Sequence, residues 1–238
     1  MLKGKKIVVT GGSGRFAGSL KKIKCRYSFI YPKKKQLDII NINSIRSYLK
    51  KNKPKSVLHL AGLSRPMIQH EKNISKSISL NIIGTANLVK VCSELNIKII
   101  YFSTSYVYPG LKGNYNESDS ILPWNNYAWS KLGGECAVQM YKNSLILRVC
   151  MTEKPFIHKK AFANVKLNFI FHEDLAKILI KILNKKGIIN IGGETKTVYN
   201  FARQYNSSIK KIFVKKKNKN VFPLNPYMNL SKLKRMIR

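Results

Sequence analysis

The chain is poor in acidic residues and cysteine, and it lacks a long apolar segment. Only 10 of its 238 residues are Asp or Glu, against 45 Lys and Arg, which gives a formal net charge of +35. No run approaches the roughly 20 apolar residues of a membrane span, and the short apolar run after Lys6 ends in glycines, so neither a membrane protein nor a secretory signal is expected. The cysteines have no metal-site spacing, which predicts free thiols, no metal and a cytoplasmic setting; they are Cys25, Cys92, Cys136 and Cys150.

The excess of positive charge does not by itself indicate nucleic-acid binding. Proteins that read base edges rely on arginine, but eight of the 45 basic residues are arginine and the other 37 are lysine. Lysine is spread through nearly every segment together with Ile and Asn, which is typical of a low-GC coding bias. Nucleic-acid binding is therefore disfavoured, while the positive field would attract small anions. The lysine runs 33–35 and 215–217 are the expected points of non-specific contact.

Apolar runs alternate with amphipathic segments along most of the chain. Strands are expected at 6–10, 27–31, 56–62, 97–102, 144–149 and 187–193, and helices at 42–51, 77–95, 127–141 and 175–183, with short ones after 198 and 230. This alternation predicts an α/β fold with a doubly wound parallel sheet of the Rossmann type. The pattern loosens after Arg148, so we expect a dinucleotide-binding core over residues 1–150 and a small substrate-facing lobe over 151–238.

A glycine-rich turn follows the first strand and precedes a helix expected to begin at Ser19. The spacing is Gly11-x-x-Gly14-x-x-Ala17. Glycine allows a tight turn and a close approach of the backbone to a pyrophosphate, and the small third residue permits close packing of helix on strand. The sequence therefore predicts a dinucleotide site, and the candidate contacts in this turn are Gly11, Gly14, Arg15, Phe16 and Ala17.

The end of the second strand bears on the type of dinucleotide. An acid there usually holds the ribose 2′-OH of NAD, whereas a basic residue suits a 2′-phosphate. Here Pro32 is followed by lysines 33–35, and the first acid is Asp38. This favours NADP(H) over NAD(H). Asp38 and Ile39 could contact the adenine, or Asp38 could start the next helix.

Two later segments offer groups for proton transfer. Hydroxyls at 103–105 end an apolar strand, and Tyr127 precedes Lys131 by four positions. Residues four apart on a helix share one face. A nearby ammonium stabilises a phenolate, so Tyr127 could exchange a proton nearer to neutral pH than free tyrosine, which titrates at about 10. A hydroxyl, a phenol and a lysine together suit the interconversion of a carbonyl and an alcohol.

Six segments in this order resemble the extended short-chain dehydrogenase/reductase superfamily, also called the NAD-dependent epimerases and dehydratases. They are Thr10–Gly14, Leu37–Ile39, His59–Gly62, Asn81–Leu88, Ser103–Tyr108 and Tyr127–Glu135. The last is similar to the Tyr-x-x-x-Lys-Leu-x-Gly-Glu of the dTDP-4-dehydrorhamnose reductases. The resemblance covers about residues 5–150 well and then thins to 168–176, 190–193 and 225–233.

The resemblance implies a reductase of 4-keto nucleotide sugars in which Tyr127 donates the proton. Lys131 would hold the nicotinamide ribose and assist Tyr127, and Thr104 would hydrogen-bond the substrate carbonyl, with Ser103 or Ser105 as substitutes if the register differs by one. The remaining implied roles are a close approach of Ala61 and Gly62 to the cofactor and bracing of the site by Asn81.

Several alternatives stay open. An epimerase would recycle bound NAD, and a non-catalytic subunit would bind the cofactor and regulate a partner enzyme. The reductases usually carry an acid where Ser105 stands, which disfavours a dehydratase, and the lobe is short for the family. The family also allows a homodimer through the helices at 77–95 and 127–141. Arg148 could reach a phosphate or pair with an acid, and neither role is assigned to it. The four histidines, at 59, 70, 158 and 172, are expected to be solvated or capping residues rather than catalysts.

Overall fold

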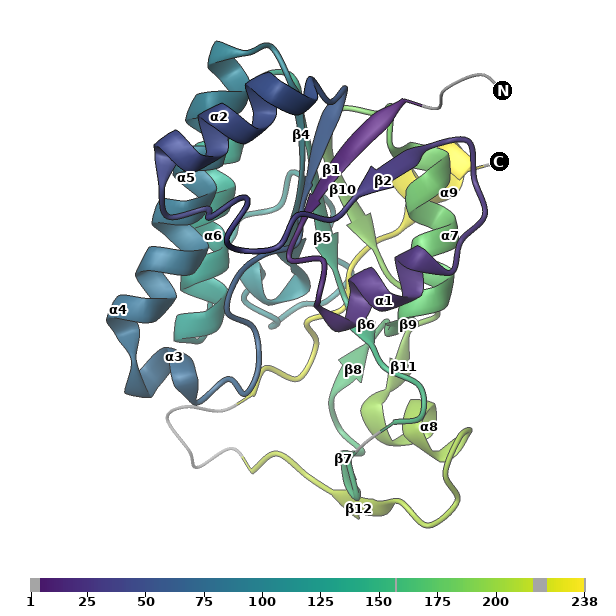
Figure 1. Ribbon diagram of the computed structural model, residues 1–238. Helices are drawn as coiled ribbons and strands as arrows, with labels where there is room; N and C mark the ends of the chain where they lie inside the picture. Colours follow the sequence, from purple (N-terminus) through teal and green to yellow (C-terminus); the bar gives the residue numbers. More distant parts are fainter. Residues whose placement is uncertain (1–4, 157, 216–221, 238) are drawn as a thin grey trace. The chain divides into compact units, whose positions relative to one another are not determined.

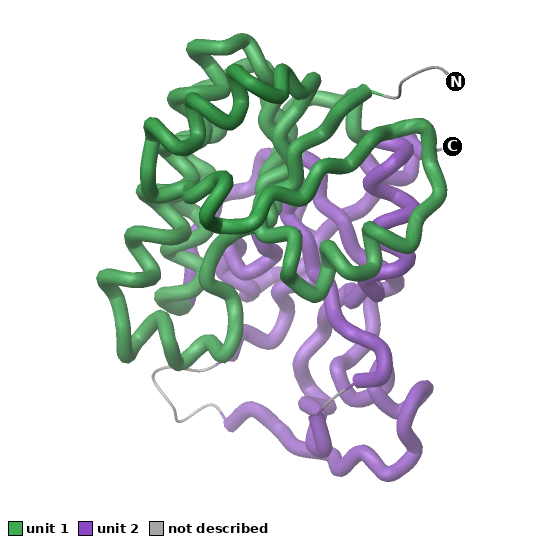
Figure 2. Tube along the Cα trace, in the orientation of Figure 1, with its two compact units in different colours: residues 1–103, 125–147, 183–188 green, residues 104–124, 148–182, 189–238 purple. Residues whose placement is uncertain are grey.

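The computed structural model describes residues 5–156, 158–215 and 222–237 (Figure 1). Lys216 and Lys217, from the second lysine run, lie outside the described residues. The chain divides into two compact units, which are coloured separately in Figure 2. The first comprises Met1–Ser103, Asn125–Leu147 and Leu183–Ile188, and the second comprises Thr104–Trp124, Arg148–Ile182 and Ile189–Arg238.

Six strands form the main sheet in the order β10-β5-β4-β3-β1-β2. Their bounds are Lys6–Thr10 for β1, Ser28–Ile30 for β2, Ser56–His59 for β3, Lys98–Thr104 for β4, Ser144–Val149 for β5 and Gly187–Ile191 for β10. β1 pairs in parallel with both β2 and β3, and β3 with β4. After β2 the chain crosses to the other side of β1, which creates the switch point of a doubly wound sheet. The predicted α/β fold class is confirmed.

The helices of the first unit cover this sheet. They are α1 (Arg15–Lys21), α2 (Ile42–Asn52), α3 (Gln69–Lys72), α4 (Ile74–Ser77), the π-helix η1 (Ile78–Ile83), α5 (Gly84–Glu94) and α6 (Asn126–Gln139). Figure 1 shows α2, α5 and α6 side by side on one face and α1 on the other. Apolar side chains from α2 and α5, such as Ile45 and Leu88, pack with Val8, Val57 and Ile99 of the strands.

Local signals explain where the helices depart from expectation. The first helix begins at Arg15 rather than at Ser19, because Gly14 already serves as its extended N-cap. The next begins at Ile42, where the side chain of Asn41 accepts from two backbone N–H groups, so Asp38 does not start it. The expected helix 77–95 is present as three consecutive pieces, with the π-helix η1 between α4 and α5.

The second unit contains short elements. They are the 3-10 turn η2 (Ser105–Val107), β6 (Met151–Thr152), β7 (Lys160–Phe162), β8 (Lys166–Leu167), β9 (Ile170–Phe171), α7 (His172–Ile182), β11 (Lys196–Thr197), α8 (Val198–Arg203), β12 (Lys210–Ile212) and α9 (Ser231–Ile237). The strands form the two-stranded pairs β11-β8, β12-β7 and β6-β9. Arg148 is buried, and its Nη1 donates to the hydroxyl of Tyr108 at 2.8 Å and to the carbonyl of Glu117 at 3.2 Å. These bonds hold the guanidinium inside this unit.

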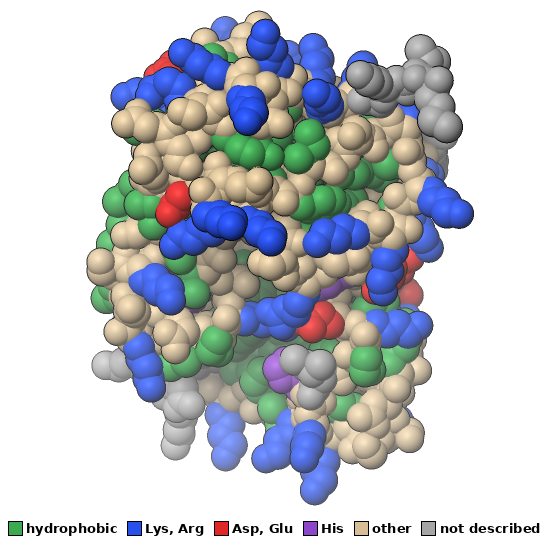
Figure 3. Space-filling model, in the orientation of Figure 1, with side chains coloured by type: hydrophobic (Ala, Val, Ile, Leu, Met, Phe, Trp, Pro, Cys, Tyr) green, Lys and Arg blue, Asp and Glu red, His purple; other side chains and the backbone are tan. Residues whose placement is uncertain are grey.

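Charge is distributed broadly over the surface. Figure 3 shows Lys and Arg side chains scattered over the visible face among polar and hydrophobic groups, rather than gathered into one stripe. Within the described ranges, no helix is long and apolar enough to cross a membrane.

Candidate active site

The glycine turn after β1 is held tightly against the segment after β3. Gly11 has a φ of 72°, and a Cβ on it would lie 2.6 Å from the backbone nitrogen of Ala61. The turn is closed by a hydrogen bond from the N–H of Gly14 to the carbonyl of Gly11 at 2.9 Å. Only glycine combines this conformation with this close approach. Gly11, Gly14 and Ala61, three predicted cofactor contacts, are thus brought together.

Tyr31, which the sequence reasoning did not select, lies against the same turn. A Cβ on Gly12 would be 2.8 Å from the Cβ of Tyr31. Lys21 spans the two, since its Nζ donates to the carbonyl of Gly12 at 2.8 Å and lies 4.9 Å from the centre of the Tyr31 ring. The Tyr31 hydroxyl is buried and has no hydrogen-bond partner among the described residues. A buried hydroxyl of this kind requires an explanation, and a bound ligand is one.

Asp38 and Ile39 are engaged by their own neighbourhood. Oδ1 of Asp38 accepts from the N–H of Ile40 at 3.1 Å, and Oδ2 lies 3.7 Å from Nζ of Lys34. The side chain of Ile39 is buried in the core and packs so closely on Gly84 that a Cβ there would lie 2.7 Å from it. The Ile39 side chain therefore serves packing, and its carbonyl already accepts from Nδ2 of Asn87 at 3.2 Å.

Asn81, on η1, fixes the backbone just after Gly62. It is 1% exposed, its Oδ1 accepts from the N–H of Leu63 at 2.7 Å, and its Nδ2 donates to the carbonyl of Leu63 at 2.9 Å. The same Nδ2 donates to Oγ of Ser130 on α6 at 2.8 Å. Ser130 in turn donates to the carbonyl of Tyr127 at 2.8 Å. Asn81 therefore links the Gly62 turn to the helix that carries Tyr127.

His59 continues this hydrogen-bonded network toward β1. Oγ1 of Thr85 donates to the carbonyl of Asn81, so it accepts from Nε2–H of His59 at 3.0 Å. Nδ1 of His59 must then accept from the hydroxyl of Thr10 at 2.8 Å, and that oxygen accepts from the N–H of Leu60 and of Ala61, each at 3.2 Å. Burial, and secondarily the charge of Lys131, lowers the pKa of His59 to about 3, so it is neutral.

Tyr127 and Lys131 stand one turn apart on α6. The helix starts here because the side chain of Asn125 caps it by accepting from the N–H of Ala128 at 2.8 Å. Nζ of Lys131 lies 4.1 Å from the ring centre of Tyr101, and its backbone carbonyl accepts from the Tyr101 hydroxyl at 2.9 Å. Burial lowers the pKa of Lys131 to about 7, while the charge of Glu135 acts in the opposite direction.

The three hydroxyls at the end of β4 have different surroundings. Ser103 donates to the buried carboxylate of Glu135 at 2.5 Å. Thr104, in the second unit, is 5% exposed, and its Oγ1 accepts from the N–H of Tyr106 at 3.2 Å. Ser105 is buried near Cys150. Ser103 thus has a fixed partner of its own, and the placement of Thr104 relative to Tyr127 stays a prediction.

The histidines differ from expectation. His59, His70 and His172 are all at least 92% buried, so the expectation that they are solvated is wrong, whereas His158 is exposed. The ring of His70 packs edge-on against Tyr127 with 5.2 Å between centroids, and its Nδ1 lies 2.7 Å from Oγ of Ser77. Burial is the main cause that lowers the pKa of His70.

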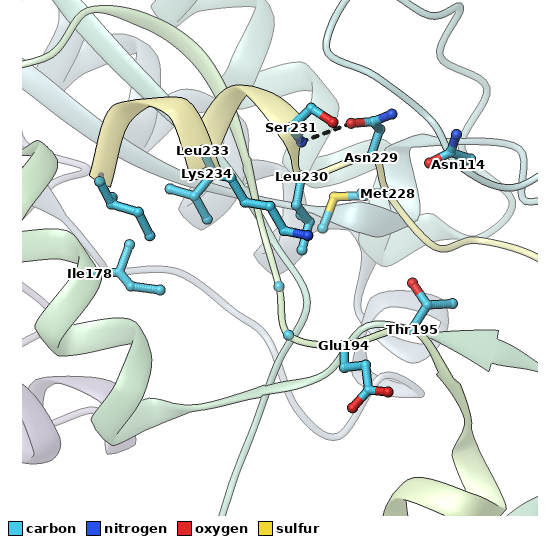
Figure 4. Close-up of a pocket in the computed structure, with 13 residues that line it drawn as sticks. Asn114, Ile178, Glu194, Thr195, Met228, Asn229, Leu230, Ser231, Leu233 and Lys234 are labelled. Atoms are coloured by element: carbon cyan, nitrogen blue, oxygen red, sulfur yellow. Dashed lines mark hydrogen bonds between the residues drawn. The ribbon is translucent and has the colours of Figure 1, made fainter.

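A pocket of about 530 Å³ lies in the second unit, and Figure 4 shows the side chains around it. Ile178 comes from α7, Glu194 and Thr195 follow β10, and Met228 to Lys234 lead into α9. None of the predicted site residues lines it. Within the described part of the chain, no group of three or more His, Cys, Asp or Glu could hold a metal ion.

A glycine turn after β1 of a doubly wound sheet, together with Tyr127 and Lys131 on α6, defines the architecture of the extended short-chain dehydrogenases and reductases. The model of the RmlD substrate binding domain matches residues 5–169. This is well over half of the chain, which therefore belongs to that family, as the resemblance of its motifs predicted.

Individual relatives are more distant. Methionine adenosyltransferase 2 subunit beta of Xenopus laevis is 28% identical over 155 residues, which cover 61% of this chain and 46% of the relative. The dTDP-4-dehydrorhamnose reductase of Aggregatibacter actinomycetemcomitans is 31% identical over 152 residues, covering 62% and 51%. The matches thus span about half the length of these relatives.

Solved structures share the fold over nearly the whole chain. The dTDP-4-dehydrorhamnose reductase of Bacillus anthracis, in complex with NADP, aligns with a TM-score of 0.86 and 21% identity over 97% of this chain and 92% of its own. The UDP-Glc/GlcNAc 4-epimerase of Campylobacter jejuni aligns with a TM-score of 0.77 and 16% identity, covering 98% and 93%. At these identities the likeness establishes the fold.

Proposed function

We propose that this protein is an NAD(P)-dependent reductase that acts on the keto group of a 4-keto nucleotide sugar. The observation that carries the proposal is the link between the two halves of the candidate site in the first unit. Tyr127 and Lys131 lie on a helix that Ser130 and Asn81 join to the Gly62 turn, and the neighbouring Ala61 abuts Gly11 of the glycine turn.

The residues of the glycine turn fit a dinucleotide. Gly11 lies against the backbone of Ala61 with no room for a side chain, which leaves the backbone exposed to a pyrophosphate. The proposed contacts are Gly11, Gly14, Arg15, Phe16, Ala17, Asp38, Ile39, Ala61, Gly62, Tyr127 and Lys131. When bound, the reduced nicotinamide would supply a hydride to the keto carbon.

The protein's own part in the reaction is to place and move a proton. Tyr127 would protonate the carbonyl oxygen as hydride arrives at the carbon, which leaves a phenolate. Lys131, as an ammonium, would stabilise that phenolate and hydrogen-bond the nicotinamide ribose. Thr104 would donate a hydrogen bond to the same carbonyl oxygen.

The direct test is cofactor titration followed by turnover with a panel of 4-keto nucleotide sugars, read from the absorbance of the reduced nicotinamide. Tyr127→Phe should leave cofactor affinity nearly unchanged and lower turnover by about 10²–10⁴, the range for a positioned acid or base. Wild-type turnover in this variant would refute the role of Tyr127. If neither cofactor binds, the glycine-turn assignment is wrong.

NADP(H) is proposed as the preferred cofactor. Lysines 33–35 follow the second strand, where a basic residue suits a 2′-phosphate. Asp38, the first acid after that strand, already pairs with Lys34 and accepts from the N–H of Ile40. Lys33→Glu should reduce NADPH affinity about 10-fold, the scale of one charge-assisted contact, with little effect on NADH. Lys90→Glu, an equal change of charge at another exposed lysine, is the control. An equal loss in both variants would point to the general field rather than to Lys33.

Recognition of the sugar nucleotide is assigned to the lobe expected at 151–238, all of which except residues 183–188 belongs to the second unit. The unit's segments begin at or near the carboxyl ends of strands, since Thr104 ends β4, Val149 ends β5 and Ile191 ends β10. Ligands of doubly wound sheets bind outside those ends. Chimaeras that exchange 151–238 with the matching part of another reductase should transfer substrate preference, and unchanged preference would contradict the assignment.

A subunit of another enzyme is the second candidate function, because several relatives of similar identity are named methionine adenosyltransferase 2 subunit beta. Such a protein would bind the cofactor without oxidising it in the presence of any sugar. An epimerase would convert a sugar nucleotide with no net change in nicotinamide absorbance. The same titration and turnover assay, with product analysis, therefore separates all three functions.

A homodimer through α6 and η1 is part of the proposal. Trp129 and Met140 are 50% and 87% exposed, and their positions place them with Gly133 and Cys136 on one stripe of α6. Ile78 and Ile83 of η1, the helix packed on Gly133, are also more than 40% exposed. Met140→Lys should convert a dimer to a monomer in light scattering, and a wild-type monomer would refute the interface.

The free thiols, including buried Cys92 and Cys150, suit the proposed cytoplasmic setting.

A further inference from the structure

A wholly buried carboxylate lies one helical turn beyond Lys131. Glu135 on α6 has an exposed fraction of 0%. Its Oε2 accepts from the hydroxyl of Ser103 at 2.5 Å, and its Oε1 accepts from Nε2 of Gln139 at 3.3 Å. Removing a carboxylate from water is costly unless charges or donors compensate it. Two neutral groups donate to this carboxylate, and a nearby cation would be a further reason to keep it buried and charged.

The charge balance around Lys131 supplies that reason. Its ammonium lies over the ring of Tyr101 on β4, at 4.1 Å from the centroid. Tyr127 precedes it on the same helix. His59 on β3 and His70 on α3 interact electrostatically with it, but burial lowers the pKa of each, and that of His59 to about 3, so neither adds a competing positive charge at neutral pH. The carboxylate of Glu135 is the group whose charge raises the pKa of Lys131.

Ser103 holds this carboxylate in place from the sheet. It is the penultimate residue of β4, and it is 2% exposed. Residues four apart on a helix lie on the same face, so Glu135 and Lys131 both face β4, where Ser103 binds the first and the ring of Tyr101 lies beneath the second. The strand and the helix thus place a buried anion and a partly buried cation on the same side of α6, one turn apart.

We propose that Glu135, held by Ser103, is a positioning residue that acts through Lys131 and keeps it in its ammonium form, one helical turn from Tyr127. A neutral amine would neither stabilise a phenolate nor present three donors to a ribose. The use of this charge in catalysis rests on the proposed function, whereas the charge balance itself is a property of the free protein.

The test measures the protonation of Lys131 without cofactor or sugar. The full chain is exposed to trace acetic anhydride over a range of pH, and the acetylation of Lys131 is quantified by mass spectrometry, because only the neutral amine reacts. Glu135→Gln keeps the shape of the side chain and its acceptor for Ser103 but removes the charge. The labelling midpoint of Lys131 should shift downward by about one pH unit in this variant.

The matched control is Glu94→Gln, which removes the exposed carboxylate that pairs with Arg46 at 3.0 Å and should leave the midpoint of Lys131 unchanged. A midpoint that is unchanged or higher in Glu135→Gln overturns the proposal. Equal shifts in both variants also overturn it, since they would reflect net charge alone.

A second measurement covers the case in which Glu135→Gln folds poorly. Lys131→Met leaves the buried carboxylate without its cation and should lower the urea midpoint of unfolding. Adding Glu135→Gln to Lys131→Met should restore part of that loss, because the two residues are coupled. A double variant no more stable than Lys131→Met alone would contradict the coupling.

The pH dependence of NADPH affinity connects the effect of Glu135 on Lys131 to function. Lys131 acts as an ammonium, so affinity should fall as pH rises through its pKa, and in Glu135→Gln this fall should occur at lower pH. If the labelling shift is found but no sugar is reduced, the proposed function fails and this inference stands. If sugars are reduced but the labelling midpoint does not move, the inference fails alone.

Discussion

Asn81→Ala should destabilise the protein far more than removal of an ordinary surface amide. Asn81 is 1% exposed, and the substitution removes its three hydrogen bonds. Its side chain accepts from the N–H of Leu63 at 2.7 Å, and it donates to the carbonyl of Leu63 at 2.9 Å and to Oγ of Ser130 at 2.8 Å. An unsatisfied buried polar group costs about 1–3 kcal/mol. Leu63 is only partly buried, so its two backbone groups regain some contact with water, and we expect a total loss of about 2–3 kcal/mol in the free energy of unfolding.

Asn87→Ala is the matched control, because this asparagine lies two turns along on α5 and makes longer and more exposed bonds. Its Nδ2 donates to the carbonyls of Ile39 at 3.2 Å and Ile40 at 3.0 Å, and its loss should cost about 1 kcal/mol or less. Urea unfolding followed by circular dichroism at neutral pH measures both. If Asn81→Ala loses no more stability than Asn87→Ala, the bracing role of Asn81 is wrong.

The remaining predictions concern two glycines and a histidine. Gly11→Ala places a Cβ 2.6 Å from the backbone of Ala61 at a φ of 72° and should abolish cofactor binding or folding, whereas Gly18→Ala, with nothing within 4 Å, should raise stability by about 0.5–1 kcal/mol; equal melting temperatures for the two variants would refute this account of the turn. The pKa of His59 in the folded protein, about 3, lies below its ordinary value of 6.5. Its contribution to the free energy of unfolding is therefore complete above pH 6.5 and is lost as the pH falls toward 3. Between pH 7 and 5 the free energy of unfolding of the wild-type protein should therefore fall by about 2 kcal/mol, and His59→Gln should not show this fall. The variant His158→Gln, at an exposed histidine, should behave as wild-type. The same pH dependence in all three proteins would rule out His59 as its source.

The parts of the site that the sequence predicted are those encoded by spacing within one short segment. The turn from Gly11 to Ala17 and the pair Tyr127 and Lys131 are recognisable because strand, turn and helix follow one another directly. The parallel arrangement of the sheet followed from the alternation of strands and helices, since parallel neighbours require a crossover connection. For this reason the fold class and the family were accessible from the sequence.

The parts that the sequence could not predict depend on partners distant along the chain. The partners of His59 could not be predicted, because the hydroxyls that bind it are 49 and 26 residues away in the sequence. Glu135 is separated from Ser103 by 32 residues, and polar residue types alone suggest exposure. The start of α1 was misplaced because Gly14 was assigned to the turn and not also to the N-cap.

A series of buried polar residues, of which the sequence analysis gave a bracing role only to Asn81, explains how the recognised site residues are held in register. Thr10, His59, Thr85 and Asn81 form consecutive hydrogen bonds from the end of β1 to η1, and Ser130 extends them to the backbone of Tyr127. The hydroxyl of Thr85 has one proton and donates it to the carbonyl of Asn81. It must therefore accept from Nε2 of His59, and Nδ1 of a neutral His59 must accept from Thr10. A histidine that became charged would donate from both nitrogens and would turn the bond at Thr10 around. Burial holds the pKa of His59 near 3, so the ring stays neutral at neutral pH, and the bonds that join the end of β1 to α6 keep one direction.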